Sequence, residues 1–188
     1  MFAVFGSTLA VAQLRDVAVK EIPGVVAAGA KWSVAWQGTD NADGIVGTVD
    51  GGVLFAQEQP NQVSKLDQND HLSVFIKDTH GAGSLSTDSN DRVVAVLRTC
   101  TDPGNAGRGI TSPCSEPTAI ALLTPERKVL AETVDEKSFG RPNDLVVAKN
   151  GGVYFTSGGA FYMNPGGRVS SIGGELRTNG IMQVMSRP

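Results

Sequence analysis

The sequence predicts an all-β protein, a β-propeller built from repeated four-stranded units, and three observations support this fold class. The 188 residues include 23 glycines and 9 prolines, which interrupt the chain too often for long helices. The segments between these breakers are short and rich in β-forming residues. The same tight turn, followed by a β-rich run, also returns along the chain. A β-sandwich offers no reason for one turn pattern to return in register, so the repeat favours a propeller.

The repeat is anchored by three turn dipeptides, Asp50-Gly51, Asn90-Asp91 and Asn150-Gly151. Their residues accept positive φ, which a tight hairpin requires. They precede the runs GVLFAQ, RVVAVLR and GVYFTSG. Each run is followed by a second strand, a polar turn and another strand, in QVSKLDQNDHLSVFI, TAIALLTPERKVLAET and AFYMNPGGRVSSIGG. The pattern therefore indicates four short strands per unit.

These units predict blades at about residues 43–78, 82–135 and 143–175, with a cysteine-containing loop at 99–116 that lengthens the second blade. The start of a fourth blade follows. Six blades of ~45 residues would need ~270 residues. We therefore expect about three blades and the start of a fourth from a six-bladed ring, in a partial domain spanning 13–188, truncated at its C-terminal side.

Residues 1–12 are apolar and end in the small-x-small pattern Ala10-Val11-Ala12, which is typical of a signal-peptide remnant. The alternative is an unprocessed N-terminal strand or helix, because no Lys or Arg precedes Arg15. A secreted or periplasmic protein would favour a disulfide between Cys100 and Cys114. Without export, the two would be unrelated reduced thiols.

The charge pattern argues against two classes of partner. The chain has 16 basic and 19 acidic residues, a formal net charge of -3, and no basic cluster. We therefore expect no nucleic-acid partner and no anionic membrane surface. No apolar stretch approaches the ~20 residues that a membrane span needs.

Polar residues stand at the entry to the predicted innermost strand of each unit, where a propeller faces its central channel. They are Asp43-Gly44, Gly81-Ala82-Gly83, Asn143-Asp144 and Asn179-Gly180. Carboxylate and amide oxygens that converge from different blades would suit a hard divalent ion. The alternative is that these residues only form turns and begin strands.

The runs RPNDLVVAKNGGVYFT, RTNGI and DGIVGTVDGGVLFAQEQPNQVSKLD resemble signatures of the senescence-marker protein/gluconolactonase/luciferin-regenerating enzyme family of six-bladed lactonases. The resemblance implies that Asp43, Asn143 and Asn179 are metal ligands. Calcium is the expected ion, and magnesium and zinc are the alternatives. It implies Arg141 and Asn143 as substrate-binding residues. Asp43 stands where the family has Glu, and the family's remaining ligand, an Asp, would lie in a blade beyond this sequence.

The resemblance implies a metal-dependent hydrolase of a small-molecule substrate, a sugar lactone or related ester, incomplete as this chain stands; no catalytic residue is assigned. The alternative is a non-catalytic propeller that binds a ligand. A third hypothesis is self-association of two copies through the open blade face.

Several further residues have expected roles outside the metal site. His80 lies in THGAG at a channel-facing entry, where it would contact substrate, line the pocket or serve a structural role. Arg98 and Glu116 flank the cysteine loop and are assigned to the pocket rim. Trp32 and Trp36 are expected to pack and anchor an N-terminal strand. Ser84 and Ser86 lack the GxSxG context of serine hydrolases, so this chemistry receives no support.

Overall fold

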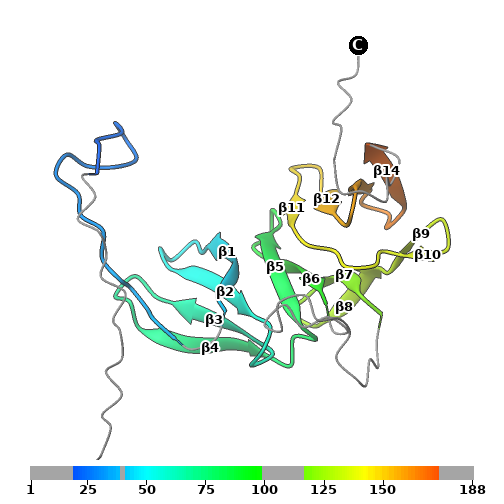
Figure 1. Ribbon diagram of the computed structural model, residues 1–188, viewed down its shortest axis with the longest axis horizontal. Coiled ribbons are helices and arrows are strands. Elements are labelled where there is room, and N and C mark those ends of the chain that lie inside the picture. Colours follow the sequence, from blue (N-terminus) through cyan, green and yellow to red (C-terminus); the bar gives the residue numbers. More distant parts are fainter. Residues whose placement is uncertain (1–18, 39–40, 99–116, 174–188) are drawn as a thin grey trace, which may run out of the picture. The chain divides into compact units, whose positions relative to one another are not determined.

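The computed structural model describes residues 19–38, 41–98 and 117–173. Within these ranges the chain forms 14 β-strands and no helix (Figure 1). The described part accordingly contains no helix with the length and apolarity needed to cross a membrane. The chain divides between Gln37 and Gly38 into two compact units.

The second unit contains three four-stranded antiparallel sheets, and in each sheet every strand pairs with the next strand in the chain. The first sheet comprises β1 (Asp43–Gly47), β2 (Val53–Gln57), β3 (Gln62–Leu66) and β4 (Leu72–Lys77). The second comprises β5 (Ala82–Thr87), β6 (Val93–Leu97), β7 (Ala119–Leu122) and β8 (Lys128–Ala131). The third comprises β11 (Leu145–Val147), β12 (Val153–Thr156), β13 (Ala160–Met163) and β14 (Val169–Gly173). A small hairpin of β9 (Thr133–Val134) and β10 (Lys137–Ser138) lies between the last two sheets in the sequence.

These sheets confirm the prediction of an all-β propeller fold, because a blade is a four-stranded antiparallel meander. The predicted fourth blade falls in residues 174–188, outside the described residues.

The tight turns form as the residue types at them require. Gly51 and Gly151 have φ of 85° and 80°, and Asp91 has φ of 57°. The left-handed region costs little for Gly and is tolerated by Asp. Two other aspartates cap turns, Asp67 between β3 and β4 and Asp88 in the β5–β6 turn that contains Asp91. Each Oδ1 accepts the N–H groups of the residues two and four positions later. Local chemistry therefore determines where each hairpin reverses.

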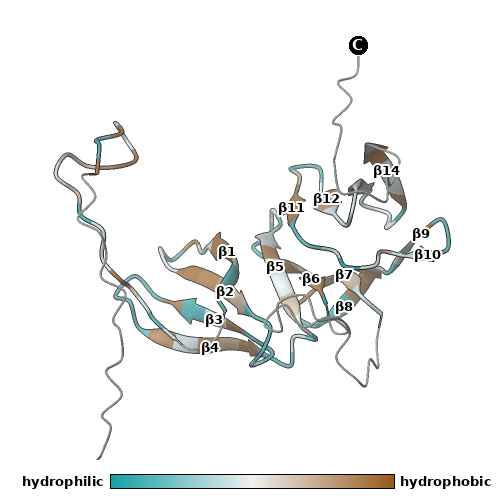
Figure 2. Ribbon diagram, viewed as in Figure 1, coloured by the Kyte–Doolittle hydropathy of each residue, from teal (hydrophilic) through white to brown (hydrophobic). Residues whose placement is uncertain are grey.

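The middle sheet is buried on both faces, which explains why β6 is apolar at every position (Figure 2). Val93, Ala95 and Leu97 belong to a core cluster shared with Leu54 and Val63 of the first sheet. Side chains alternate across a strand, so the residues between them point to the opposite face. Those residues join a second cluster with the third sheet, comprising Val94, Val96, Ile120, Leu122, Phe139, Val153, Phe155, Phe161 and Met163.

Serine hydroxyls join the innermost strands of the second and third sheets. The backbone N–H of Leu145 donates to Ser84 Oγ at 3.3 Å, and that of Val147 donates to Ser86 Oγ at 3.1 Å. These bonds satisfy amide groups of β11 that face another sheet rather than a strand partner. The two serines thus have a structural role at the blade interface.

The first unit differs from expectation. In its described residues, the only β pairing is an isolated bridge between Ile22 and Val26. Trp32 was expected to pack and anchor a strand, but 68% of its surface is exposed. This expectation was wrong, because no sheet forms in residues 19–37 for the indole to cover.

Candidate functional site

The first component of the site is the start of β1, where the strand approaches β5 of the next sheet. The β1–β2 register shifts between Asp43 and Val46, and Gly44 has φ of 46°. A β-carbon on Gly44 would lie 2.6 Å from the Cα of Ser84, so only glycine permits this approach. The N–H of Gly44 donates to Asp43 Oδ1 at 2.9 Å, which orients the carboxylate.

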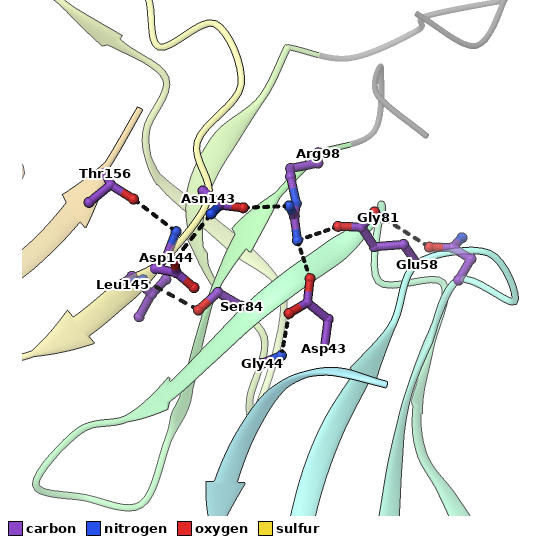
Figure 3. Close-up of polar contacts among 11 residues, drawn as sticks. Asp43, Gly44, Glu58, Gly81, Ser84, Arg98, Asn143, Asp144, Leu145 and Thr156 are labelled. Atoms are coloured by element: carbon purple, nitrogen blue, oxygen red, sulfur yellow. Dashed lines mark hydrogen bonds and ion pairs between the residues drawn. The ribbon is translucent and has the colours of Figure 1, made fainter. Parts of the chain in front are cut away.

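The second component is Arg98, which follows β6 directly. Its backbone N–H donates to the carbonyl of Gly81 at 2.9 Å and extends the β5–β6 pairing by one residue. The guanidinium then reaches residues of the first and third blades (Figure 3). Nη2 donates to Asp43 Oδ2 at 2.8 Å and contacts Glu58 Oε1, while Nη1 donates to Asn143 Oδ1 at 3.0 Å. One side chain therefore links residues of all three blades.

The third component is the pair Asn143 and Asp144, just before β11. Thr156 of β12 holds their backbone: its carbonyl accepts the Asn143 N–H at 2.8 Å, and its own N–H donates to the Asp144 carbonyl at 3.0 Å. The Asn143 side-chain Nδ2 donates to Asp144 Oδ2 at 3.1 Å. The amide oxygen of Asn143 is consequently turned toward Arg98 and its nitrogen toward Asp144.

Burial divides the charged cluster into a closed part and an open part. The side chains of Arg98 and Glu58 are each 3% exposed, whereas that of Asp43 is 43% exposed. A buried charge is tolerated only when it is paired, and removal of one partner costs about 3–5 kcal/mol. Arg98 and Glu58 thus form a buried support. The Asp43 carboxylate is open to solvent on that support, where it can accept a proton or hydrogen bonds from a bound molecule.

The structure brings two of the predicted site residues together, because Asp43 and Asn143 are both bound by Arg98. His80 lies in the connection between β4 and β5, half-buried with φ of 55°. Arg141 is exposed, two residues before Asn143. Asn179, Cys100 and Cys114 lie outside the described residues, so the roles assigned to them remain predictions.

Sequence reasoning missed the centre of this cluster. Glu58 was not singled out, and Arg98 was assigned only to a pocket rim. A signal was present, because each is a charged residue placed at or just after the end of an apolar strand, in VLFAQE and VVAVLR. Both are buried, and a buried charge indicates an ion pair. The partner could not be identified without the tertiary contacts.

The described residues do not fit a divalent ion in the arrangement they adopt. Asp43 Oδ2 and Asn143 Oδ1, the oxygens expected to bind a metal, both accept hydrogen bonds from the Arg98 guanidinium. An ion at the same oxygens would lie within a few ångströms of that positive charge. At ~4 Å, two unit charges of like sign repel by about 4 kcal/mol at an effective dielectric constant of ~20, and a divalent ion doubles this, so the guanidinium offsets the attraction that the Asp43 carboxylate exerts on the ion.

Comparison with known proteins supports the fold assignment. No family model matches the sequence, and no curated protein matches it. A gluconolactonase from Xanthomonas campestris is similar in structure, with a TM-score of 0.59, 14% identity, and coverage of 73% of this chain and 49% of that one. A candidate gluconolactonase has a TM-score of 0.56 and 15% identity, with coverage of 73% of this chain and 50% of that one. A third similar structure is an inactive variant of virginiamycin B lyase from Staphylococcus aureus with quinupristin. Its TM-score is 0.50 and its identity 12%, with coverage of 80% of this chain and 46% of that one.

The chain spans about half the length of the solved structures it matches. At these identities the likeness shows a shared fold and leaves the activity to the residues of the site.

Proposed function

We propose that this propeller hydrolyses a small-molecule lactone or related ester at the end of the sheets where Asp43 and Asn143 meet. The observation that carries the proposal is an exposed carboxylate held in one orientation: Asp43 accepts from Arg98 Nη2 at 2.8 Å and from the Gly44 N–H at 2.9 Å. The fold likeness to gluconolactonases and the sequence resemblance described above support the same substrate class.

In this proposal Asp43 acts as the general base. Its carboxylate takes a proton from a water molecule, and the water oxygen attacks the carbonyl carbon of the ester. The ring C–O bond then breaks, and the leaving oxygen takes the proton held by Asp43, so that water and lactone yield a hydroxy acid and the carboxylate is regenerated. A positioned base of this kind contributes about two to four orders of magnitude in rate.

Two further residues orient the substrate. The Asn143 amide is fixed by Arg98 on one side and Asp144 on the other, so it presents a defined edge to a bound molecule. Arg141 is exposed two residues earlier and supplies a positive charge for the oxygen on which negative charge develops. The expected divalent ion enters no step here, because the contacts of Arg98 do not fit an ion at Asp43 and Asn143.

Asp43→Asn tests the catalytic role, because the amide keeps the size of the side chain and removes the base. We expect kcat/KM for an aldonolactone panel, followed by acid release, to fall by about two orders of magnitude or more. The matched control is Asp50→Asn in the β1–β2 turn, an aspartate that also pairs with a basic side chain, Lys65. Full activity of Asp43→Asn would count against the proposal.

A second candidate is a non-catalytic module that binds a sugar acid or lactone. The observation that favours it is that the Asn143 amide and both Asp43 oxygens already take part in internal hydrogen bonds. Calorimetry separates the candidates: saturable binding of an aldonolactone by wild type, without acid release, supports the module and contradicts the hydrolase.

A further inference from the structure

We propose that the Arg98 guanidinium is the resident cation of this site, and that Asp43 and Asn143 are held by an arginine in place of a divalent ion. The inference does not depend on catalysis, because it concerns only what neutralises and positions these side chains. It assigns Arg98 as the positioning residue for both groups.

Arg98 binds the same kinds of oxygen that a metal ion would bind. These oxygens are Asp43 Oδ2 at 2.8 Å, Asn143 Oδ1 at 3.0 Å, and Glu58 Oε1. A mixed set of carboxylate and amide oxygens from different blades is what a hard cation would select. A guanidinium can satisfy such a set because its donors lie in a rigid planar fork that reaches several acceptors at once.

The charges of Arg98 and of the two carboxylates beside it also favour an arginine over a divalent ion. Asp43 and Glu58 carry two negative charges and Arg98 carries one positive charge, so the three together carry a net charge of −1. Glu58 and Arg98 are almost completely buried, and their charges must be matched inside the protein. Without Arg98, the two carboxylates would carry −2, which a divalent ion would match. With Arg98 in place, that ion would meet a like charge at the same oxygens.

The backbone of β5 leaves room for the guanidinium at Gly83. A β-carbon on Gly83 would lie 1.6 Å from Arg98 Nη2, so any other residue at this position would occupy the volume of the guanidinium. The β5–β6 register shifts between Ala82 and Ser84, which places Gly83 in an irregular part of the strand. Such irregularities re-aim side chains beside sites. The strand is therefore built to hold a large planar cation at this point.

The experiment measures cation binding by the whole chain, with Ca²⁺ by calorimetry and Mn²⁺ by electron paramagnetic resonance. For wild type we expect no saturable binding at submillimolar concentrations and the same melting temperature in EDTA and in calcium. Arg98→Leu removes the charge, and we expect divalent-ion affinity at least about tenfold tighter than in wild type. Its melting temperature should then rise with calcium concentration, because a ligand that binds only the folded state stabilises it.

Two controls separate charge from packing. Arg98→Lys keeps one positive charge but loses the fork, so it should stay insensitive to calcium even though its melting temperature falls. Arg92→Leu removes an arginine of the β5–β6 turn that pairs with Asp88, and it should gain no cation binding. A merely structural role of Arg98 would lower stability in Arg98→Leu without creating cation affinity.

Tight binding of Ca²⁺ or Mn²⁺ by wild type, lost in Asp43→Asn, would overturn the inference. So would a drop in the wild-type melting temperature in EDTA, or an Arg98→Leu protein that folds and binds no cation. If Arg98→Leu does not fold, the wild-type and Asp43→Asn titrations still decide the question. None of these readouts uses lactone turnover, so a failure here is distinguishable from a failure of the proposed hydrolase.

Discussion

The Arg98 guanidinium lies against the backbone of Gly83, so closely that a β-carbon there would fall 1.6 Å from Nη2. Gly83 belongs to β5 and Arg98 follows β6, so the contact joins two neighbouring strands of one sheet. From this position Nη2 reaches Asp43 and Glu58 of the preceding sheet. A side chain at residue 83 would therefore require the guanidinium to shift from this position.

Gly83→Ala should displace the guanidinium and destabilise the fold. Inserting a methyl group into a close-packed position costs typically about 1–3 kcal/mol, and here it also disturbs a buried ion pair. Urea unfolding monitored by circular dichroism measures the change. Gly47→Ala in β1 is the control, because a β-carbon there would meet nothing within 4 Å. Equal stability of the two variants would contradict the packing of Arg98 on Gly83.

Arg98→Met should destabilise the protein through Glu58. The methionine fills part of the volume but leaves a carboxylate with a 3% exposed side chain without its cation. The expected loss is about 3–5 kcal/mol. Adding Glu58→Gln should recover part of that loss, since the double variant also removes the carboxylate charge that Arg98 neutralises. The same change at Arg92, whose side chain is 47% exposed, should cost about 0–1 kcal/mol.

Ser86→Ala should weaken the contact between the second and third sheets. The variant removes the acceptor of the Val147 N–H and leaves that amide without its bond from Ser86 Oγ. A hydrogen bond of this kind contributes about 0.5–1.5 kcal/mol. Hydrogen exchange should show faster exchange at Val147, and Ser73→Ala on the exposed strand β4 serves as the control. Unchanged exchange at Val147 would argue against the bond.

The β1–β2 turn should contribute an acid-sensitive component of stability. Hydrogen bonds from Lys65 and then Thr48 lower the pKa of Asp50 from 3.8 to about 2. A carboxyl group with a depressed folded-state pKa stabilises the fold above its unfolded pKa, and this contribution disappears as the pH falls through the folded-state value. Wild type should therefore have a higher urea midpoint than Asp50→Asn. This difference should reach its maximum above pH 3.8 and disappear near pH 2. A difference independent of pH would show that the ion pair does not stabilise the turn.

Much of the fold could be predicted because its signals are local. Gly51, Asp91 and Gly151 adopt positive φ, as their residue types allow, and each is followed by a strand of the predicted composition. The run RVVAVLR was likewise predicted as a β-rich segment, and Val93–Leu97 forms β6. By contrast, Trp32 was misassigned, because an apolar side chain does not specify whether a sheet is present for it to cover.

The sequence by itself determined the strands, the turns and the order of the sheets, since hairpin pairing joins neighbours in the chain and depends on turn chemistry and a period of two. It also indicated Asp43 and Asn143 as site residues through their place before an inner strand. Only the tertiary structure decided that Arg98 binds both, across 55 and 45 residues of sequence. That contact arises from the packing of separate sheets. Local sequence preferences do not determine which carboxylate a buried cation will contact.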